Sequence, residues 1–137
     1  MSSPCGAGRR VLVVDDDAGI RLLLVTFLRQ HGFHPRQARN GREAIEAMRA
    51  GIIDLVITDL MMPEVTGWEV LRQRTHDLTL LRIPIIVISA INTKQAMASV
   101  AGRHVFAVLG KPFDLDKLLS AVTTSLDHTG VPSPLAA

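Results

Sequence analysis

Acidic, hydroxyl and amino side chains follow four apolar runs of this sequence, each at the point where the run stops. The first run ends at Asp15 and Asp16, a later one at Asp59, and two more at Ser89 and Lys111. Three carboxylates that lie close together repel one another unless a cation lies between them. Clustered carboxylate oxygens suit a hard divalent ion, and Mg²⁺ typically takes one or two carboxylates together with waters and phosphate oxygens. The set therefore indicates chemistry on a phosphate group.

Phosphoryl transfer to a carboxylate is the reaction that uses such a set. The transferred group carries charge on its equatorial oxygens, so the protein needs positioning and cations more than acid–base groups. Mg²⁺ would neutralise one oxygen, the ammonium of Lys111 a second, and the hydroxyl of Ser89 would donate a hydrogen bond to a third. We therefore interpret Asp59 as a phosphoryl-accepting nucleophile that the other residues serve.

The apolar runs themselves are typical of buried strands. Runs such as 11–14 and 85–88 show no polar alternation, which indicates a strand covered on both faces, as in parallel sheets. The run at 33–38 contains Pro35, which cannot donate to a neighbouring strand, so this strand is expected at an edge of the sheet. The five expected strands are 11–14, 33–38, 53–58, 85–88 and 105–109.

Amphipathic stretches with apolar residues at helical spacing separate these strands, and capping residues stand at several of their starts. Five helices are expected, with starts near Asp17, Asn40–Gly41, Trp68, Thr93 and Asp114. The alternation predicts an α/β fold, with a doubly wound parallel sheet and helices on both faces. Ligands in such folds bind beyond the carboxyl ends of central strands. The acidic, hydroxyl and amino side chains at the four strand ends should therefore meet at one site.

The length and composition of the chain indicate one domain. With 137 residues, 47% of them hydrophobic, the chain can bury a single core. We expect a flexible N-terminal tail at 1–8, a folded domain at 9–127 and a disordered C-terminal tail at 128–137. The final helix should turn five apolar side chains inward, namely Leu115, Leu118, Leu119, Val122 and Leu126.

Charge and cysteine content narrow the function classes. A net charge of +2 does not indicate nucleic-acid binding by itself, and the arginines of the first third are interpreted as solvated helix faces, with a basic docking patch as the alternative. The single cysteine, Cys5, allows no internal disulfide. No apolar run approaches the length of a membrane span, and the start of the chain lacks a signal-peptide core. A cytoplasmic location is expected.

Four motifs carry a resemblance to a known family. They are Val13–Asp17, Asp54–Pro63 with Gly67, Ile83–Ala90 and Lys111–Phe113. In order and spacing they resemble the receiver domain of bacterial two-component response regulators, over roughly residues 11–126. The resemblance implies a flavodoxin-like, five-stranded sheet of order 2-1-3-4-5. It also implies phosphorylation of Asp59 by a histidine kinase or a histidine phosphotransfer protein, followed by altered binding to a downstream effector.

The same resemblance implies a magnesium site. Its ligands would be Asp16, Asp59 and the backbone carbonyl of Met61, with Asp15 acting through a water molecule. The bond between Lys111 and Pro112 is expected in the cis form, an option that is specific to proline.

The chain departs from the family at one position and has apolar residues at two others. Val108 stands three residues before the lysine, where the family usually has an aromatic switch residue. Met61 and Ile91, each two residues past Asp59 and Ser89, flank the site. We hypothesise that these apolar side chains restrict the attacking water and slow self-dephosphorylation. The alternative is that they only cover the core.

Other readings of the sequence remain open. The favoured one is a stand-alone receiver that is no enzyme beyond self-phosphorylation and slow self-dephosphorylation, with pairing of two copies left open. Alternatives are a receiver from a larger hybrid protein and a degenerate receiver that binds partners without phosphorylation. A haloacid-dehalogenase-like phosphatase would need a further acidic pair, and only Asp114 and Asp116 follow Lys111, at a helix start. A dinucleotide-binding fold is excluded because no glycine fingerprint follows the first strand.

Overall fold

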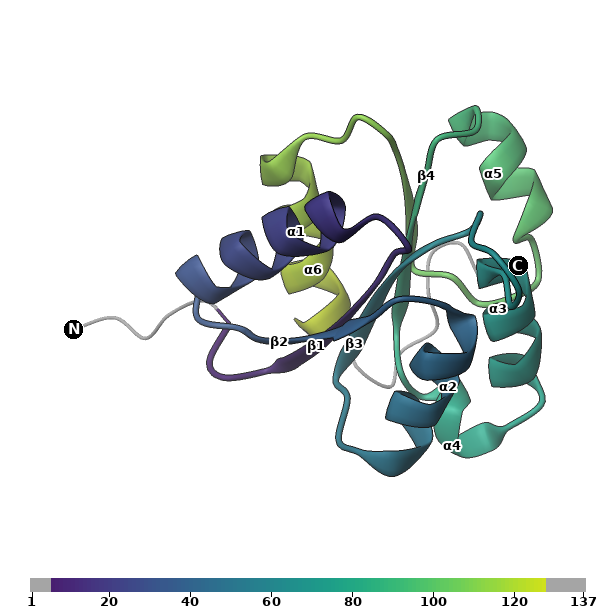
Figure 1. Ribbon diagram of the computed structural model, residues 1–137, viewed down its shortest axis with the longest axis horizontal. Coiled ribbons are helices and arrows are strands. Elements are labelled where there is room, and N and C mark those ends of the chain that lie inside the picture. The colour runs from purple at the N-terminus through teal and green to yellow at the C-terminus, as the bar shows by residue number, and fades with distance from the viewer. Residues whose placement is uncertain (1–5, 128–137) are drawn as a thin grey trace.

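Five parallel strands in the order β2-β1-β3-β4-β5 form the central sheet of the computed structural model, which describes residues 6–127 (Figure 1). This order is the one that the resemblance implied. Pro35 lies in β2 at an edge of the sheet, where its missing N–H is tolerated, as expected. The strands are β1 (Arg10–Val14), β2 (His34–Ala38), β3 (Leu55–Asp59), β4 (Ile85–Ser89) and β5 (Ala107–Gly110).

Helices cover both faces of the sheet. Helices α1 and α6 lie on one face, and α2, α3, α4 and α5 lie on the other (Figure 1). Within residues 6–127 there are six helices, so the prediction of five was wrong by one. The unexpected α4 is a single turn of four residues, which is too short to show a helical repeat in the sequence. The helices are α1 (Ala18–Gln30), α2 (Gly41–Ala50), α3 (Gly67–Thr75), α4 (Leu78–Leu81), α5 (Thr93–Ser99) and α6 (Leu115–Asp127).

The apolar strands supply two cores at once. Along β1, Leu12 and Val14 pack in the core under α2 to α5, whereas Val11 and Val13 pack in the core under α1 and α6. All five residues of β3 and all five of β4 are buried. Each fully buried aliphatic side chain stabilises the fold by roughly 1.5–3 kcal/mol. This two-sided burial explains why the strands show no polar alternation.

Polar caps begin several helices where the sequence predicted them. Asp17 accepts hydrogen bonds from the backbone N–H of Gly19 (2.8 Å) and Ile20 (3.2 Å) at the start of α1. The start of α2 is fixed in the same way by Asn40, which accepts from the N–H of Glu43 at 2.9 Å. Asp114 accepts from two backbone N–H groups at the start of α6. These caps satisfy donors that a helix cannot satisfy internally and set where each helix leaves the site edge.

Part of the segment predicted as an N-terminal tail is bonded to the loop between α1 and β2. Gly6 N–H donates to the carbonyl of His31 (2.8 Å), and Gly8 N–H donates to that of Gly32 (2.9 Å). The predictions for residues 1–5 and 128–137 concern positions outside the described residues. No helix between residues 6 and 127 is long and apolar enough to cross a membrane.

Arg74 in α3 is a buried arginine that the sequence did not reveal. Its guanidinium donates to the backbone carbonyls of Leu81 (3.3 Å), Ile83 (2.9 Å), Arg103 (2.9 Å) and His104 (3.2 Å). Burial lowers the pKa of Arg74 to about 10. The side chain ties α3 to the segments that lead into β4 and β5, and so holds these strands at their amino ends.

Candidate functional site

The predicted chemical residues lie at the carboxyl edge of the sheet. Asp59 is the last residue of β3 and Ser89 the last of β4, whereas Asp15 and Lys111 directly follow β1 and β5. Strand register aligns these ends, because Asp59 pairs with Ile88 and Ser89 with Gly110 in the ladders β3–β4 and β4–β5. The sheet therefore brings side chains from four strands to one place, as the α/β pattern predicted.

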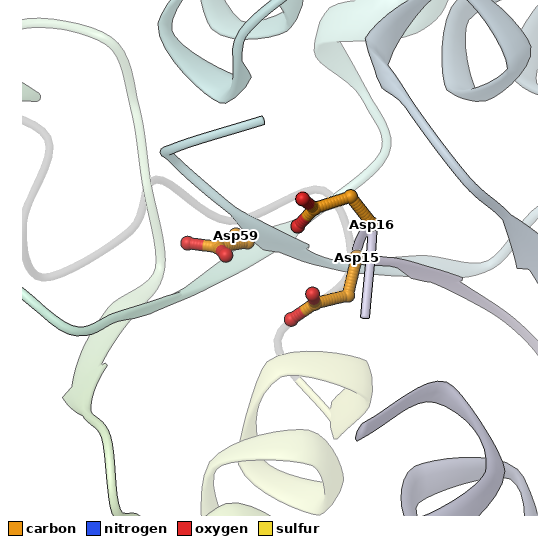
Figure 2. Close-up of side chains that lie close together, drawn as sticks. All are labelled: Asp15, Asp16 and Asp59. Carbon is orange, nitrogen blue, oxygen red and sulfur yellow. The ribbon is translucent and has the colours of Figure 1, made fainter. Parts of the chain in front are cut away.

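Three carboxylates converge at this edge. Figure 2 shows Asp15, Asp16 and Asp59 close together, and each offers an oxygen within 4.8 Å of the oxygens of the other two. Asp15 and Asp59 are buried, whereas Asp16 is exposed. Asp17 is not part of this cluster, because its carboxylate caps α1. Three hard oxygen donors at this spacing, one of them open to solvent, fit a divalent cation that keeps several waters.

Lys111 joins two of the three carboxylates. Its Nζ donates to Oδ2 of Asp15 at 2.8 Å and to Oδ2 of Asp59 at 3.0 Å. Burial alone would lower the pKa of Lys111, but the hydrogen bonds and charges of both aspartates outweigh it and raise that pKa. Lys111 is therefore a fixed cation at neutral pH, and it offsets part of the repulsion within the acidic cluster.

The two oxygens of Asp59 have different donors. Oδ1 accepts from the backbone N–H of Met61 at 3.2 Å, and Oδ2 accepts from Lys111. An ionised carboxylate oxygen can accept more than one bond, so both oxygens keep lone pairs for another ligand. These two bonds fix the plane of the carboxylate and leave both oxygens able to accept a further ligand.

The loop after Asp59 packs tightly against the start of α3. Gly67 N–H donates to the carbonyl of Leu60 at 2.9 Å. A Cβ at position 67 would lie 2.7 Å from Cα of Leu60 and closer still to the carbonyl oxygen of Asp59. Only glycine fits there, so Gly67 helps to hold the backbone that carries Asp59 and Met61.

A family model described as the response regulator receiver domain matches residues 11–123. This chain belongs to that family. The match covers β1 to α6 and includes every residue of the site, which explains why the sequence motifs and the acidic cluster occur together.

Proteins with similar sequences agree with this family assignment. Over 82% of its length the chain is 34% identical to response regulator RR06 of Streptococcus pneumoniae, of which it covers 50%. It is 37% identical over 83% of its length to the sensor kinase/phosphatase CqsS of Vibrio cholerae, of which it covers 17%. The chain thus spans half or less of these curated relatives. A solved receiver protein from Pseudomonas putida is 30% identical, with a TM-score of 0.79 and coverage of 90% of this chain and 99% of that one.

The resemblance raised two further points, which are the form of the Lys111–Pro112 bond and the environment of Val108. The Lys111–Pro112 peptide bond is cis, which confirms that expectation. The backbone N–H of Lys111 donates to the carbonyl of Ser89 at 2.7 Å, so the ends of β4 and β5 are tied together. Val108, at the position where the resemblance implies an aromatic residue, is half-buried in β5 and packs against the core under α2 to α5.

Ser89 ends β4 at the same edge of the sheet as Asp59. The side chain is fully buried, and its Oγ accepts from the backbone N–H of Ile91 at 3.2 Å. Its hydrogen is left to donate elsewhere, because a hydroxyl both donates and accepts. Met61 is 55% exposed, so its side chain does not cover the core, whereas Ile91 is partly buried against it.

Proposed function

We propose that this receiver domain is a phosphoryl-accepting switch in which Asp59 is the acceptor. The observation that carries the proposal is the pair of ion-paired hydrogen bonds from Lys111 to Asp15 and to Asp59, beside a cluster of three carboxylates that could hold a cation. A lysine and a set of metal ligands around one nucleophilic carboxylate serve phosphoryl transfer better than any acid–base reaction. The phosphoryl donor would be a histidine kinase or a histidine phosphotransfer protein.

The reaction is an in-line displacement at phosphorus. A carboxylate oxygen of Asp59 forms a bond to phosphorus, and the P–N bond of phosphohistidine breaks. The electron pair stays with the imidazole of the donor, which then takes up a proton. Asp59 needs no general base because its carboxylate is already the nucleophile. Lys111 binds one oxygen of the transferred group, and the hydroxyl of Ser89 donates to another.

The acidic cluster would hold Mg²⁺. Asp16, Asp59 and the backbone carbonyl of Met61 are the proposed direct ligands, with Asp15 acting through a water molecule. When bound, the ion supplies positive charge to one phosphoryl oxygen and lowers the repulsion between Asp59 and the incoming dianion. The oxygen donors within 4.8 Å of one another, without a nitrogen or sulfur ligand among them, support this choice of metal.

The functional product of the reaction is the phosphorylated protein itself and not a released compound. The acyl phosphate adds charge at the ends of β3, β4 and β5, which biases the domain toward a second conformation and alters its binding to an effector protein. The proposal includes a cytoplasmic location and a slow self-dephosphorylation. In this proposal, the second conformation determines which surface binds an effector or a second copy of the chain.

Incubation with acetyl phosphate and Mg²⁺, followed by intact mass measurement, tests the proposal. We expect a gain of one phosphoryl group that disappears with a chelator and in Asp59→Asn. The matched control is Asp17→Asn, which removes a neighbouring charge outside the cluster and keeps a residue that can cap α1. A phosphoryl gain that survives Asp59→Asn contradicts the assignment, and no gain in the wild type would instead favour a phosphorylation-independent binding module.

A further inference from the structure

The guanidinium of Arg21 reaches from the first turns of α1 back to the acidic cluster. Its Nη1 donates to the backbone carbonyl of Asp15 at 2.7 Å, and its Nε donates to the side-chain oxygen of Gln37 at 3.0 Å. Gln37 belongs to β2, so the side chain bridges the loop after β1 and the neighbouring strand. The planar fork of arginine allows both bonds at once and leaves the group little freedom.

The carbonyl that Arg21 holds belongs to the peptide unit that joins Asp15 to Asp16. A peptide unit is planar, so fixing its carbonyl also fixes the positions of the backbone N–H and the Cα of Asp16. The guanidinium therefore acts on Asp16 through the backbone, although it bonds to Asp15.

The two aspartates differ in how their side chains are held. Asp15 has independent partners, because Oδ1 accepts from the N–H of Asp17 (2.9 Å) and Oδ2 from Lys111 (2.8 Å). Asp16 is exposed, and its carboxylate has no hydrogen-bond partner among residues 6–127. No side-chain contact among these residues orders the Asp16 carboxylate, so the backbone that places its Cα is what positions it.

We propose that Arg21 is a positioning residue for the cation site. By fixing the Asp15–Asp16 peptide, Arg21 places Asp16 so that its carboxylate can bind the ion. The proposal rests on the magnesium site proposed above and adds the device that orders its most exposed ligand. Groups that orient metal ligands commonly contribute a factor of roughly 10–100 to metal affinity.

The charge of Arg21 has the opposite effect on a cation. A guanidinium beside the cluster repels Mg²⁺, so removing the charge alone would strengthen binding. Loss of the hydrogen bond to Asp15, in contrast, frees Asp16 and weakens binding. The sign of the change in affinity therefore separates positioning from simple electrostatics.

Calorimetric titration of the full chain with Mg²⁺ tests the inference. For Arg21→Ala we expect the dissociation constant to rise by about 10-fold. The control is Arg29→Ala, which removes the same charge from an exposed position on the same helix and should change the affinity little. Gln37→Leu keeps the guanidinium but removes its second anchor, so it should weaken Mg²⁺ binding in the same direction and by less. Arg21→Lys keeps the charge without the fork and should not restore affinity.

The possible results separate the role of Arg21 from the existence of the magnesium site. An affinity that is unchanged or tighter in Arg21→Ala, with wild-type binding intact, overturns the role of Arg21 and leaves the magnesium site standing. A wild-type chain that binds no Mg²⁺ overturns both. If Arg21→Ala does not fold, as judged by thermal unfolding without Mg²⁺, Gln37→Leu decides by the same criterion. Excess Mg²⁺ should also restore phosphorylation of Arg21→Ala by acetyl phosphate, and a defect that Mg²⁺ cannot restore counts against positioning.

Discussion

The ammonium of Lys111 lies 3.0 Å from Oδ2 of Asp59, so a cation is bonded to the proposed acceptor carboxylate before any phosphoryl group arrives. The same ammonium lies 2.8 Å from Oδ2 of Asp15. Lys111 therefore offsets the charge of the resting cluster, and in the proposed reaction the same ammonium binds an oxygen of the transferred group.

Lys111→Met tests the role of Lys111 in the proposed reaction. Removing the cation should slow phosphorylation by acetyl phosphate by roughly 100-fold, comparable to the loss of one donor to a developing oxyanion. Initial rates from intact mass at saturating Mg²⁺ give this value. Lys117→Met is the matched control, because Lys117 is an exposed residue of α6. Equal rates for Lys111→Met and the wild type would remove Lys111 from the reaction.

Asp16→Asn should stabilise the chain when no divalent ion is present. The carboxylate repels Asp15 and Asp59 across less than 4.8 Å, and the amide does not. We expect a higher melting temperature than the wild type in chelator, together with loss of the rise that Mg²⁺ produces in the wild type. Thermal unfolding with and without Mg²⁺ measures both effects. Asp17→Asn should retain the Mg²⁺-dependent rise, and its loss there would mean that the cluster has been assigned wrongly.

Making Met61 and Ile91 polar should shorten the life of the acyl phosphate. Met61 is 55% exposed beside Asp59, so an amide or carboxylate in its place could hold a water near phosphorus. For Met61→Asn combined with Ile91→Glu we expect self-dephosphorylation at least a few-fold faster, measured as decay of the phosphorylated mass. Leu78→Asn, at an exposed apolar position of α4, controls for the general effect of a new polar side chain at the surface. An unchanged or longer lifetime would refute the idea that these side chains restrict water.

Arg74→Met should destabilise the fold by about 2–4 kcal/mol, because buried carbonyls that Arg74 now satisfies would lose their donors. Arg72→Met is the matched control, two residues away on α3. Arg72 pairs with Glu69 at the surface, and such exposed pairs contribute only about 0–1 kcal/mol. Urea unfolding gives both values. A small effect at Arg74 would show that water or another donor replaces the guanidinium.

Much of the fold followed from the sequence because buried parallel strands leave a strong pattern. Runs such as 11–14 must be apolar on both faces, and their polar end residues must meet where the strands end. This is why the sequence alone groups Asp15, Asp59, Ser89 and Lys111. Strand limits were less certain, since β5 begins at Ala107 and not at Val105.

The remaining features depend on tertiary contacts that have no local pattern. Arg74 looks like one of several helix-surface arginines, and its burial depends on carbonyls from segments up to 30 residues away. Arg21 is similar, because its partners lie in a loop and in β2. The four residues of α4 are too few to show a repeat. The sequence therefore did not indicate which side chains bond to distant backbone carbonyls.

Reductive trapping of the phosphorylated chain tests the assignment of Asp59 most directly. Borohydride converts an aspartyl phosphate into homoserine, so peptide mass spectrometry after treatment with acetyl phosphate and Mg²⁺ locates the acceptor. We expect homoserine at position 59 and at no other aspartate, and none when Mg²⁺ is removed. Homoserine at Asp15 or Asp16, or an acid-stable phosphate on another residue with Asp59 unmodified, would contradict the proposed switch.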